Sequence, residues 1–336
     1  MGLSAQAYLA RERSRMRTLI VHNPKSGFGS DAVFQFERAL VHAGDECVLR
    51  VLAPGDNGEK ILADAEDFDV VVVSGGDGTV ASLLYDLRGR KVPTCVFPSG
   101  TANLLCANIG NGAEPAALAR ACRQNTYADL DMGEMSWVDE KGEKQRAGFS
   151  LMSGTGFDAQ LMQAALPNKA SMGQAAYFAA VLENTHPDVI QFKITVDGQV
   201  YEREGITCMV ANNAMMQGDI QIVPNCRMDD GCLDVIVVET DRAAQLLRPL
   251  IFGLVDPSGN AIGRPKLESF SGRHIKVEAS KPVPIEIDGE VVDGKTLAYE
   301  AVCLPGASRI IVDSMSPYKA AAVEPVAGEE EIAYPE

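Results

Sequence analysis

The sequence predicts two domains: an α/β domain with a doubly wound parallel sheet, then an antiparallel β domain of sandwich type. Up to Asp129, short apolar runs alternate with helical patterns, and loops rich in Gly, Ser, Thr or Asn join them. Such alternation is typical of a parallel sheet. Beyond Asp129, most segments read as strands separated by Asp-Gly turns, which favours antiparallel pairing. We expect the domains over residues 17–129 and 130–318, and a disordered tail over 319–336.

The strongest signal in the first domain lies between Asp69 and Leu87. Four consecutive valines at 70–73 indicate a strand that is buried on both faces of a parallel sheet. A glycine-rich turn at 74–79 follows, and then apolar residues recur at helical spacing. Glycines allow the backbone to approach a ligand closely, and the N-terminus of a helix favours an anion. The stretch therefore predicts a phosphate-binding loop, although a tight turn in an ordinary α/β fold is the alternative.

The other elements of this domain repeat the same arrangement. The sequence predicts strands at 18–22, 47–52 and 92–97, loops at 23–27 and 98–103, a helix from Ser30 or Asp31 to Ala43, a short helix at 60–66, and a helix to Ile109 that Thr101 caps. In a doubly wound sheet, ligands gather at the carboxyl ends of the strands. We therefore expect the three loops rich in small residues to meet at one edge.

Two familiar nucleotide motifs do not explain the central loop. The lysine-bearing P-loop pattern is absent. The loose dinucleotide pattern occurs twice, at 76–81 and at 27–32, but neither match is followed by a strand that ends in an acidic residue about twenty positions on. The sequence therefore gives no support to a dinucleotide site of that type.

The second domain is predicted from a series of β-branched or alternating segments. These are residues 192–196, 206–211, 233–238, 275–279, 284–287, 297–302 and 309–312, and Asp-Gly pairs at 197, 230, 288 and 293 mark turns. Two helices are expected to interrupt the strands, at 175–183 and 242–255.

Acidic turns in the second domain are the candidates for catalysis. Asp229-Asp230-Gly231, Asp288-Gly289-Glu290 and the 154–158 segment each place carboxylates at the end of or between strands. Each alone is more simply an ordinary turn, because Asp-Gly is a favoured hairpin pair. Together with a phosphate loop they fit phosphoryl transfer, which needs a phosphate site, Mg²⁺ on oxygen ligands and a carboxylate that takes a hydroxyl proton. A cleft between the domains would bring these parts together.

The composition excludes several other classes of function. The net charge of −16 over 336 residues argues against nucleic acid as the main partner. No apolar run approaches the length of about 18 residues that a membrane span needs, and no signal peptide is evident. The eight cysteines form no CxxC pair, which is typical of reduced core residues in a cytoplasmic protein. The four histidines have no zinc spacing, and no GxSxG elbow is present.

Six short motifs then occur in a fixed order. They are Asn23-Pro24-x-Ser26-Gly27, Gly75-Gly76-Asp77-Gly78-Thr79, Pro98-x-Gly100-Thr101-Ala102-Asn103, Gly154-x-Gly156-Phe157-Asp158-Ala159, Asp229-Asp230-Gly231-x-Leu233-Asp234 and Ile287-Asp288-Gly289-Glu290. In this order they resemble the diacylglycerol kinase catalytic-domain family, whose relatives include sphingosine and ceramide kinases and, more distantly, NAD kinases. The resemblance covers residues 17–312.

The resemblance implies the following site residues. ATP would be held by Asn23, Pro24, Lys25, Ser26, Gly27, Gly75, Gly76, Asp77, Gly78, Thr79 and Thr101. Glu290 would accept the proton, with Asp288 and Asp77 in the same network of metal and water, and either aspartate is an alternative base. Mg²⁺ would bind the side chain of Asp230 and the backbones of Arg227 and Cys232. Leu104 stands where many members have an acidic residue, which removes one polar contact near the nucleotide.

The resemblance thus implies an ATP- and Mg²⁺-dependent lipid kinase that meets its substrate at the membrane surface. Diacylglycerol is the first candidate substrate and a sphingoid base the second. A homodimer is compatible with the sequence. Two rival functions are a soluble kinase of the NAD-kinase type and a nucleotide-binding regulator without turnover.

Overall fold

The computed structural model describes residues 15–26, 31–53, 55–100, 102–156, 188–216, 220–221, 223, 226–239, 268–313 and 315–318. Several expectations lie outside the described residues. They are the helices at 175–183 and 242–255, the tail at 319–336, the Phe157-Asp158 pair, Gly27 and Thr101.

The N-terminal half is an α/β unit, as predicted. Its elements are β1 (Arg17–His22), α2 (Ala32–His42), β2 (Glu46–Val51), α3 (Gly58–Ile61), a 3₁₀ turn (Ala65–Asp67), β3 (Val70–Gly75), α4 (Asp77–Leu87), β4 (Thr94–Pro98), α5 (Leu104–Asn108) and α6 (Pro115–Gln124). The strands lie in the order β4-β3-β1-β2, and all three of these pairings are parallel.

Helices cover both faces of this sheet. Side chains along each strand alternate between the two faces, so each strand packs against a different set of helices on each side. Val72 and its even-numbered neighbours pack with Phe36 of α2 and Leu118 of α6. Val71 and the odd-numbered residues pack with Leu84 of α4. All four valines of β3 are fully buried, which is why the strand carries no polar residue until Ser74. The predicted doubly wound sheet is therefore confirmed.

The C-terminal half is antiparallel and sandwich-like, also as predicted. Its strands are β5 (Tyr127–Val138), β6 (Lys144–Phe149), β7 (Met152–Gly156), β8 (Ile190–Val196), β9 (Gln199–Gly205), β10 (Thr207–Ala211), β11 (Met215–Met216), β12 (Ile220–Gln221), β13 (Leu233–Val238), β14 (Glu268–Gly272), β15 (His274–Ile287) and β16 (Glu290–Ile311). Apart from the short β11–β12 pair, every strand of this half joins the same sheet as β1–β4.

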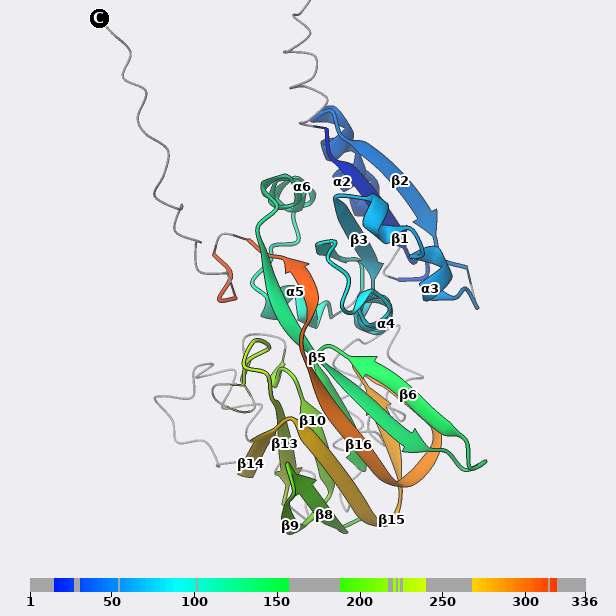
Figure 1. The fold of residues 1–336 in the computed structure, drawn as a ribbon, viewed down its shortest axis with the longest axis vertical. Coiled ribbons are helices and arrows are strands. Elements are labelled where there is room, and N and C mark those ends of the chain that lie inside the picture. The colour runs from blue at the N-terminus through cyan, green and yellow to red at the C-terminus, as the bar shows by residue number, and fades with distance from the viewer. Residues whose placement is uncertain are drawn as a thin grey trace, which may run out of the picture.

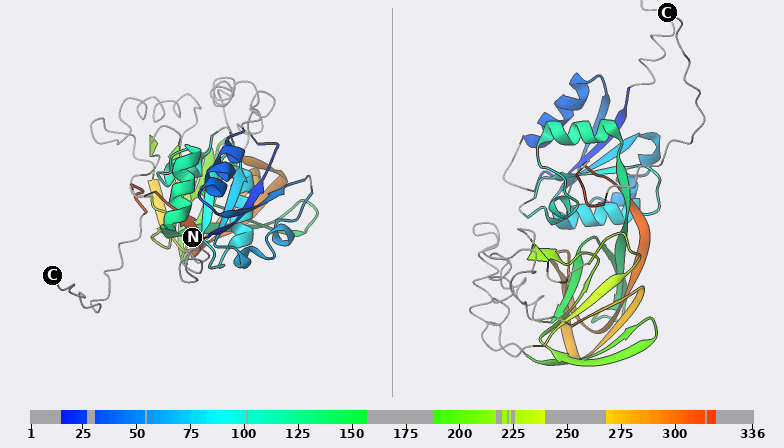
Figure 2. Two further views of the ribbon diagram at one scale, coloured as in Figure 1. Left: turned by 90° about the horizontal axis from the view of Figure 1, so that it is seen from above. Right: turned by 90° about the vertical axis from the view of Figure 1, so that its left-hand side faces the viewer.

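Two long strands, β5 and β16, run through both halves (Figures 1 and 2). β16 pairs with β15 and β5 in the C-terminal half, and near its end Ile310 pairs in parallel with Thr94 of β4. The strand order therefore continues from β15 through β16 to β4 without a break. The two halves share one sheet, and α4 lies at the boundary between them (Figure 1).

Several local predictions were wrong. The segments at 275–279 and 284–287 both fall in the single strand β15, and those at 297–302 and 309–312 both fall on β16, which ends at Ile311. The Asp293-Gly294 pair does not separate strands, because an irregularity in the β15–β16 register absorbs it inside β16. The short helix α3 ends at Ile61, and α6 has no counterpart among the predicted elements. Asn103, and not Thr101, occupies the position before α5.

The packing of β5 on β6 yields a test of the fold. Gly133 lies opposite Phe149, and a methyl group at Gly133 would lie 1.9 Å from the ring atom Cζ. Because Phe149 is fully buried, Gly133→Ala should lower the free energy of unfolding by about 1–3 kcal/mol. Gly112→Ala is the control, since a methyl group there meets nothing within 4 Å. Equal denaturation midpoints for the two variants would contradict this packing.

Candidate functional site

The loops after β1 and β3 are tied together at the carboxyl edge of the parallel sheet. The Asn23 N–H donates to the Ser74 carbonyl at 2.8 Å, and the Asn23 side-chain amide donates to Thr79 Oγ1 at 2.8 Å. The Gly76 N–H donates to Ser26 Oγ at 3.0 Å. The two sequence motifs, fifty residues apart, therefore form one structural unit.

The loop after β4 packs against this unit. The Ser99 and Ser74 hydroxyls are 2.6 Å apart, and a methyl group at Gly100 would lie 2.6 Å from the Cα of Gly76. Glycine is therefore required at Gly100 for the two loops to touch. His22 Nδ1 lies 2.9 Å from Ser74 Oγ, and burial lowers the pKa of His22, which keeps the ring neutral at pH 7. No sequence motif had singled out His22.

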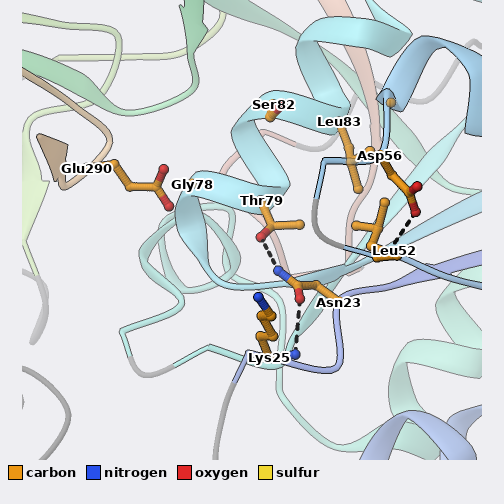
Figure 3. A pocket seen from close by; sticks show the side chains of 11 residues that line it. Asn23, Lys25, Leu52, Asp56, Gly78, Thr79, Ser82, Leu83 and Glu290 are labelled. Atoms are coloured by element: carbon orange, nitrogen blue, oxygen red, sulfur yellow. Dashed lines mark hydrogen bonds between the residues drawn. The ribbon is translucent and has the colours of Figure 1, made fainter. Parts of the chain in front are cut away.

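A cavity of about 280 Å³ opens beside these loops (Figure 3). It is lined by Asn23, Lys25, Leu52, Ala53, Asp56, Gly58, Gly78, Thr79, Ser82, Leu83 and Glu290. Four segments of the chain thus contribute polar groups to one space: the loop after β1, Asp56 in the loop after β2, the first turns of α4, and the first residue of β16.

The first turn of α4 gives this cavity the character of an anion site. The N–H groups at the start of a helix have no acceptor within the helix, and the helix dipole adds partial positive charge there. Gly78 has no side chain to cover this turn, and a methyl group at Gly78 would lie 2.1 Å from Glu290 Oε1. The Glu290 carboxylate therefore lies against the N-terminus of α4. The side chain of Lys25 also lines the cavity (Figure 3).

Asp288 is placed quite differently from Glu290, although only Gly289 separates them. Its carboxylate accepts four hydrogen bonds, from the N–H groups of Ser150, Leu151 and Met152 at 2.7–2.9 Å and from the Ser150 hydroxyl at 3.0 Å. Burial raises the pKa of Asp288 to about 6, and these donors oppose the shift. Asp288 does not line the cavity. It holds the β15–β16 turn against the start of β7 and the two residues before it.

Asp77 is also directed away from the cavity. Its Oδ1 accepts the N–H of Leu105 in α5 at 3.4 Å, so the carboxylate lies at the start of that helix. Burial raises the pKa of Asp77, and backbone N–H groups of the α5 start oppose the shift. Of the three carboxylates that the sequence singled out, Glu290 is therefore the one that lines the cavity. Their catalytic roles remain predictions.

The predicted metal-binding turn lies on the surface. Asp230 is exposed, and its Oδ1 accepts the Cys232 N–H at 3.0 Å. The Arg227 side chain donates two hydrogen bonds of 2.7 Å to Asp229. The backbone carbonyl of Arg227 takes no part in these two bonds. Within the described residues, no group of three or more His, Cys, Asp or Glu side chains could hold a metal ion. One carboxylate with backbone carbonyls fits a hard cation that keeps several waters.

Buried Asp131 supports this turn and was not foreseen. Its carboxylate accepts the Gly231 N–H at 2.6 Å and the Gly306 N–H at 2.7 Å, and so joins the turn to β16. Asn212 extends the network, because its amide donates to the carbonyls of Asp131 and Ser150. No local motif marks either residue, since their partners lie far away along the chain. Ser82, Leu52 and Asp56 also line the cavity, and they belong to none of the six sequence motifs.

Two family models match this chain. Residues 17–135 match the diacylglycerol kinase catalytic domain, and residues 152–312 match the YegS C-terminal NAD kinase beta sandwich-like domain. A diacylglycerol kinase of Mycobacterium tuberculosis (strain H37Rv) is 29% identical over 239 residues, which are 68% of this chain and 76% of the relative. A probable lipid kinase YegS-like of Pseudomonas aeruginosa (strain PAO1) is 27% identical over 310 residues, which are 89% of this chain and 95% of the relative.

The fold is shared with a solved structure as well. A crystal structure of a diacylglycerol kinase from Bacillus anthracis (strain Sterne) superposes with a TM-score of 0.69 at 23% identity, over 89% of this chain and 98% of the other. Among the helices of the described ranges, none has both the length and the apolar character needed to cross a membrane.

The placement of Asp288 predicts that it supports the fold. In Asp288→Asn, an amide NH₂ would face some of the four donors, which leaves buried hydrogen bonds unmade. The free energy of unfolding should fall by about 1–3 kcal/mol, measured by chemical denaturation. Glu290→Gln is the matched control, since Glu290 is exposed and its substitution should leave stability near that of the wild type. The assignment is wrong if Asp288→Asn is as stable as the control.

Proposed function

Since this chain belongs to the diacylglycerol kinase catalytic-domain family of lipid kinases, we propose that it transfers the γ-phosphate of ATP to the hydroxyl of diacylglycerol or a related lipid. One observation carries this proposal: the cavity joins an anion-binding helix start to an exposed carboxylate. Gly78 and Thr79 belong to the first turn of α4, and Glu290 lies against them from β16.

The residues of the cavity suit a nucleotide triphosphate. The N–H groups of the α4 start and the cation of Lys25 would bind phosphate oxygens, and the Asn23–Thr79 hydrogen bond would fix the loop around them. Gly76 and Gly100 leave the backbone uncovered where the loops touch. ATP supplies the transferable phosphoryl group, and Mg²⁺ offsets its charge.

Glu290 is proposed to accept the proton of the lipid hydroxyl. A general base must reach the proton that it removes, and among Glu290, Asp288 and Asp77 only Glu290 lines the cavity. Asp288 would act through structure, because it fixes the turn that presents Glu290. Asp230, with the backbones of Arg227 and Cys232, would hold a Mg²⁺ ion that keeps several waters.

Transfer of labelled phosphate tests the proposed reaction and its rivals together. The protein is incubated with γ-labelled ATP and Mg²⁺, and with vesicles that contain diacylglycerol, vesicles that contain a sphingoid base, or free NAD. Labelled phosphatidic acid is the expected product. Label in the sphingoid base would change the lipid, label in NADP would favour the NAD-kinase type, and ATP binding without any labelled product would favour a regulator without turnover.

Gly76→Ala tests the phosphate site. A methyl group at Gly76 would lie 3.9 Å from Gly100 Cα and from Ser26 Oγ, so the protein has room for it and should fold normally. The same methyl group would keep phosphates away from the loop. We expect calorimetry to show no ATP binding, while Gly112→Ala binds as the wild type does. Unchanged ATP affinity in folded Gly76→Ala would place the phosphates elsewhere.

Glu290→Gln tests the proton acceptor. The amide keeps the shape of the side chain and loses its basicity. We expect kcat to fall about 10²–10⁴-fold, the usual cost of losing a general base, with ATP affinity close to that of the wild type. Steady-state rates with the accepted lipid provide the measurement. A rate within about threefold of the wild type would exclude Glu290 as the base, because a proton acceptor cannot be nearly dispensable.

A further inference from the structure

One face of α4 both lines the cavity and contacts the C-terminal half. Gly78, Ser82 and Tyr85 are spaced four and three residues apart, which places them on the same side of the helix. Gly78 contacts Glu290 of β16, and Ser82 lines the cavity. Tyr85 lies about 10 Å from Gly78 along the helix axis, because each residue adds about 1.5 Å. Any slide or rotation of α4 would therefore change its contacts at both points.

Tyr85 occupies a site formed by a cross-strand pair of the C-terminal half. Glu134 of β5 and Gly148 of β6 are direct partners in the β-ladder, so their positions share one face of the sheet. A methyl group at Gly148 would lie 2.2 Å from Tyr85 Cδ2 and 2.7 Å from Tyr85 Cβ. The missing side chain of Gly148 thus makes room for the tyrosine. We call this pair of residues the Tyr85 socket.

Polar contacts fix Tyr85 in the socket. Its hydroxyl donates to Glu134 Oε2, and Glu134 Oε1 lies 3.5 Å from Arg146 Nη1. The Arg88 guanidinium also lies 3.9 Å from the centre of the Tyr85 ring. Burial and the nearby Glu134 raise the pKa of Tyr85 to about 12, so the phenol stays protonated and donates at neutral pH. A hydrogen bond to a carboxylate is stronger than one between neutral groups.

We propose that Tyr85 is a positioning residue: in the socket of Glu134 and Gly148 it sets the place of α4 against the C-terminal half, and so the spacing between the phosphate loop and Glu290. This proposal rests on the proposed function of that site. The spacing matters because the phosphate-binding turn and the proton acceptor come from different halves of the chain. A misplacement of about 1 Å can cost about 10²-fold in rate.

Tyr85→Phe removes the hydroxyl and keeps the ring in the socket. We expect kcat for lipid phosphorylation to fall about tenfold, part of the loss that a misplacement of about 1 Å can cause, while the Kd for ATP stays near that of the wild type. Glu134→Ala should do the same, Glu134→Gln should recover most of the rate because its amide oxygen still accepts, and Tyr85→Phe/Glu134→Ala should be no slower than either variant alone. Tyr201→Phe is the control, since that ring stacks on Phe270 and not on α4.

The Glu290→Gln background separates positioning from general damage. If Tyr85 acts through the place of Glu290, Tyr85→Phe should lower the residual rate of Glu290→Gln less than twofold. An equal loss in both backgrounds, or a kcat for Tyr85→Phe within about twofold of the wild type, would overturn the proposal.

A second measurement does not depend on turnover. Hydrogen exchange followed by mass spectrometry should show faster exchange in α4 and in the β5–β6 pair of Tyr85→Phe, with β8–β9 unchanged as an internal reference. Unchanged exchange in α4 and in β5–β6 would overturn the proposal even if the wild type phosphorylates no lipid. Absence of labelled lipid from the wild type would instead contradict the proposed function, so the two failures are distinguishable.

Discussion

The arrangement of this protein depends on strand β16. It begins at Glu290 in the cavity, pairs with β5 from Tyr299 to Ile311, and near its end joins the parallel sheet at Thr94 of β4. Backbone hydrogen bonds of one sheet therefore connect the loops of the N-terminal half to the turn that carries Glu290. A cleft between two separately folded units would leave their relative position to side-chain contacts, whereas here a shared strand fixes one side and α4 contacts the other.

Burial and the available hydrogen-bond donors give the aspartates of similar Asp-Gly turns different roles. Asp197 and Asp288 both have positive φ and precede a glycine in a hairpin between strands. Asp197 is exposed and accepts the N–H groups of Arg273 and His274, which lower its pKa. Asp288 is buried beneath residues 150–152, so desolvation raises its pKa in spite of four donors. Asp230 is exposed, and the buried Asp131 carboxylate accepts the Gly231 N–H of the same turn.

Local chemistry made much of the fold predictable. The valine run of β3, the glycine-rich start of α4 and the Asp-Gly hairpin at 288 depend on neighbours in the sequence, and the structure places them as expected. Asp293-Gly294 misled the prediction because Gly294, with a φ of 92°, fits a bulge as well as it fits a turn. The fusion of two predicted segments into β16 follows from pairing with β5, whose register no local pattern contains.

The candidate site was predictable only in part, for the same reason. Motif spacing identified Asn23, Gly78 and Glu290, which all line the cavity. It could not separate Glu290 from Asp288, since the donors that surround Asp288 lie 136–138 residues away along the chain. Nor could it indicate that Gly148 makes room for Tyr85, because a glycine in a strand gives no sign of the side chain that fills its space.

The whole chain is strongly acidic, and the carboxylates of Asp56 and Glu290 line the cavity, yet the cavity also offers donors for an anion. A net charge of −16 disfavours anions in general, but at physiological salt the field of a surface charge is screened within about 8 Å. The helix start of α4 and Lys25 act at contact distance, where screening is weak. Glu290 lies against that helix start, so an arriving phosphate group would compete with it for the same donors. The carboxylate would then be displaced from the N-terminus of α4 but would remain next to the transferred group, which is where a proton acceptor has to be.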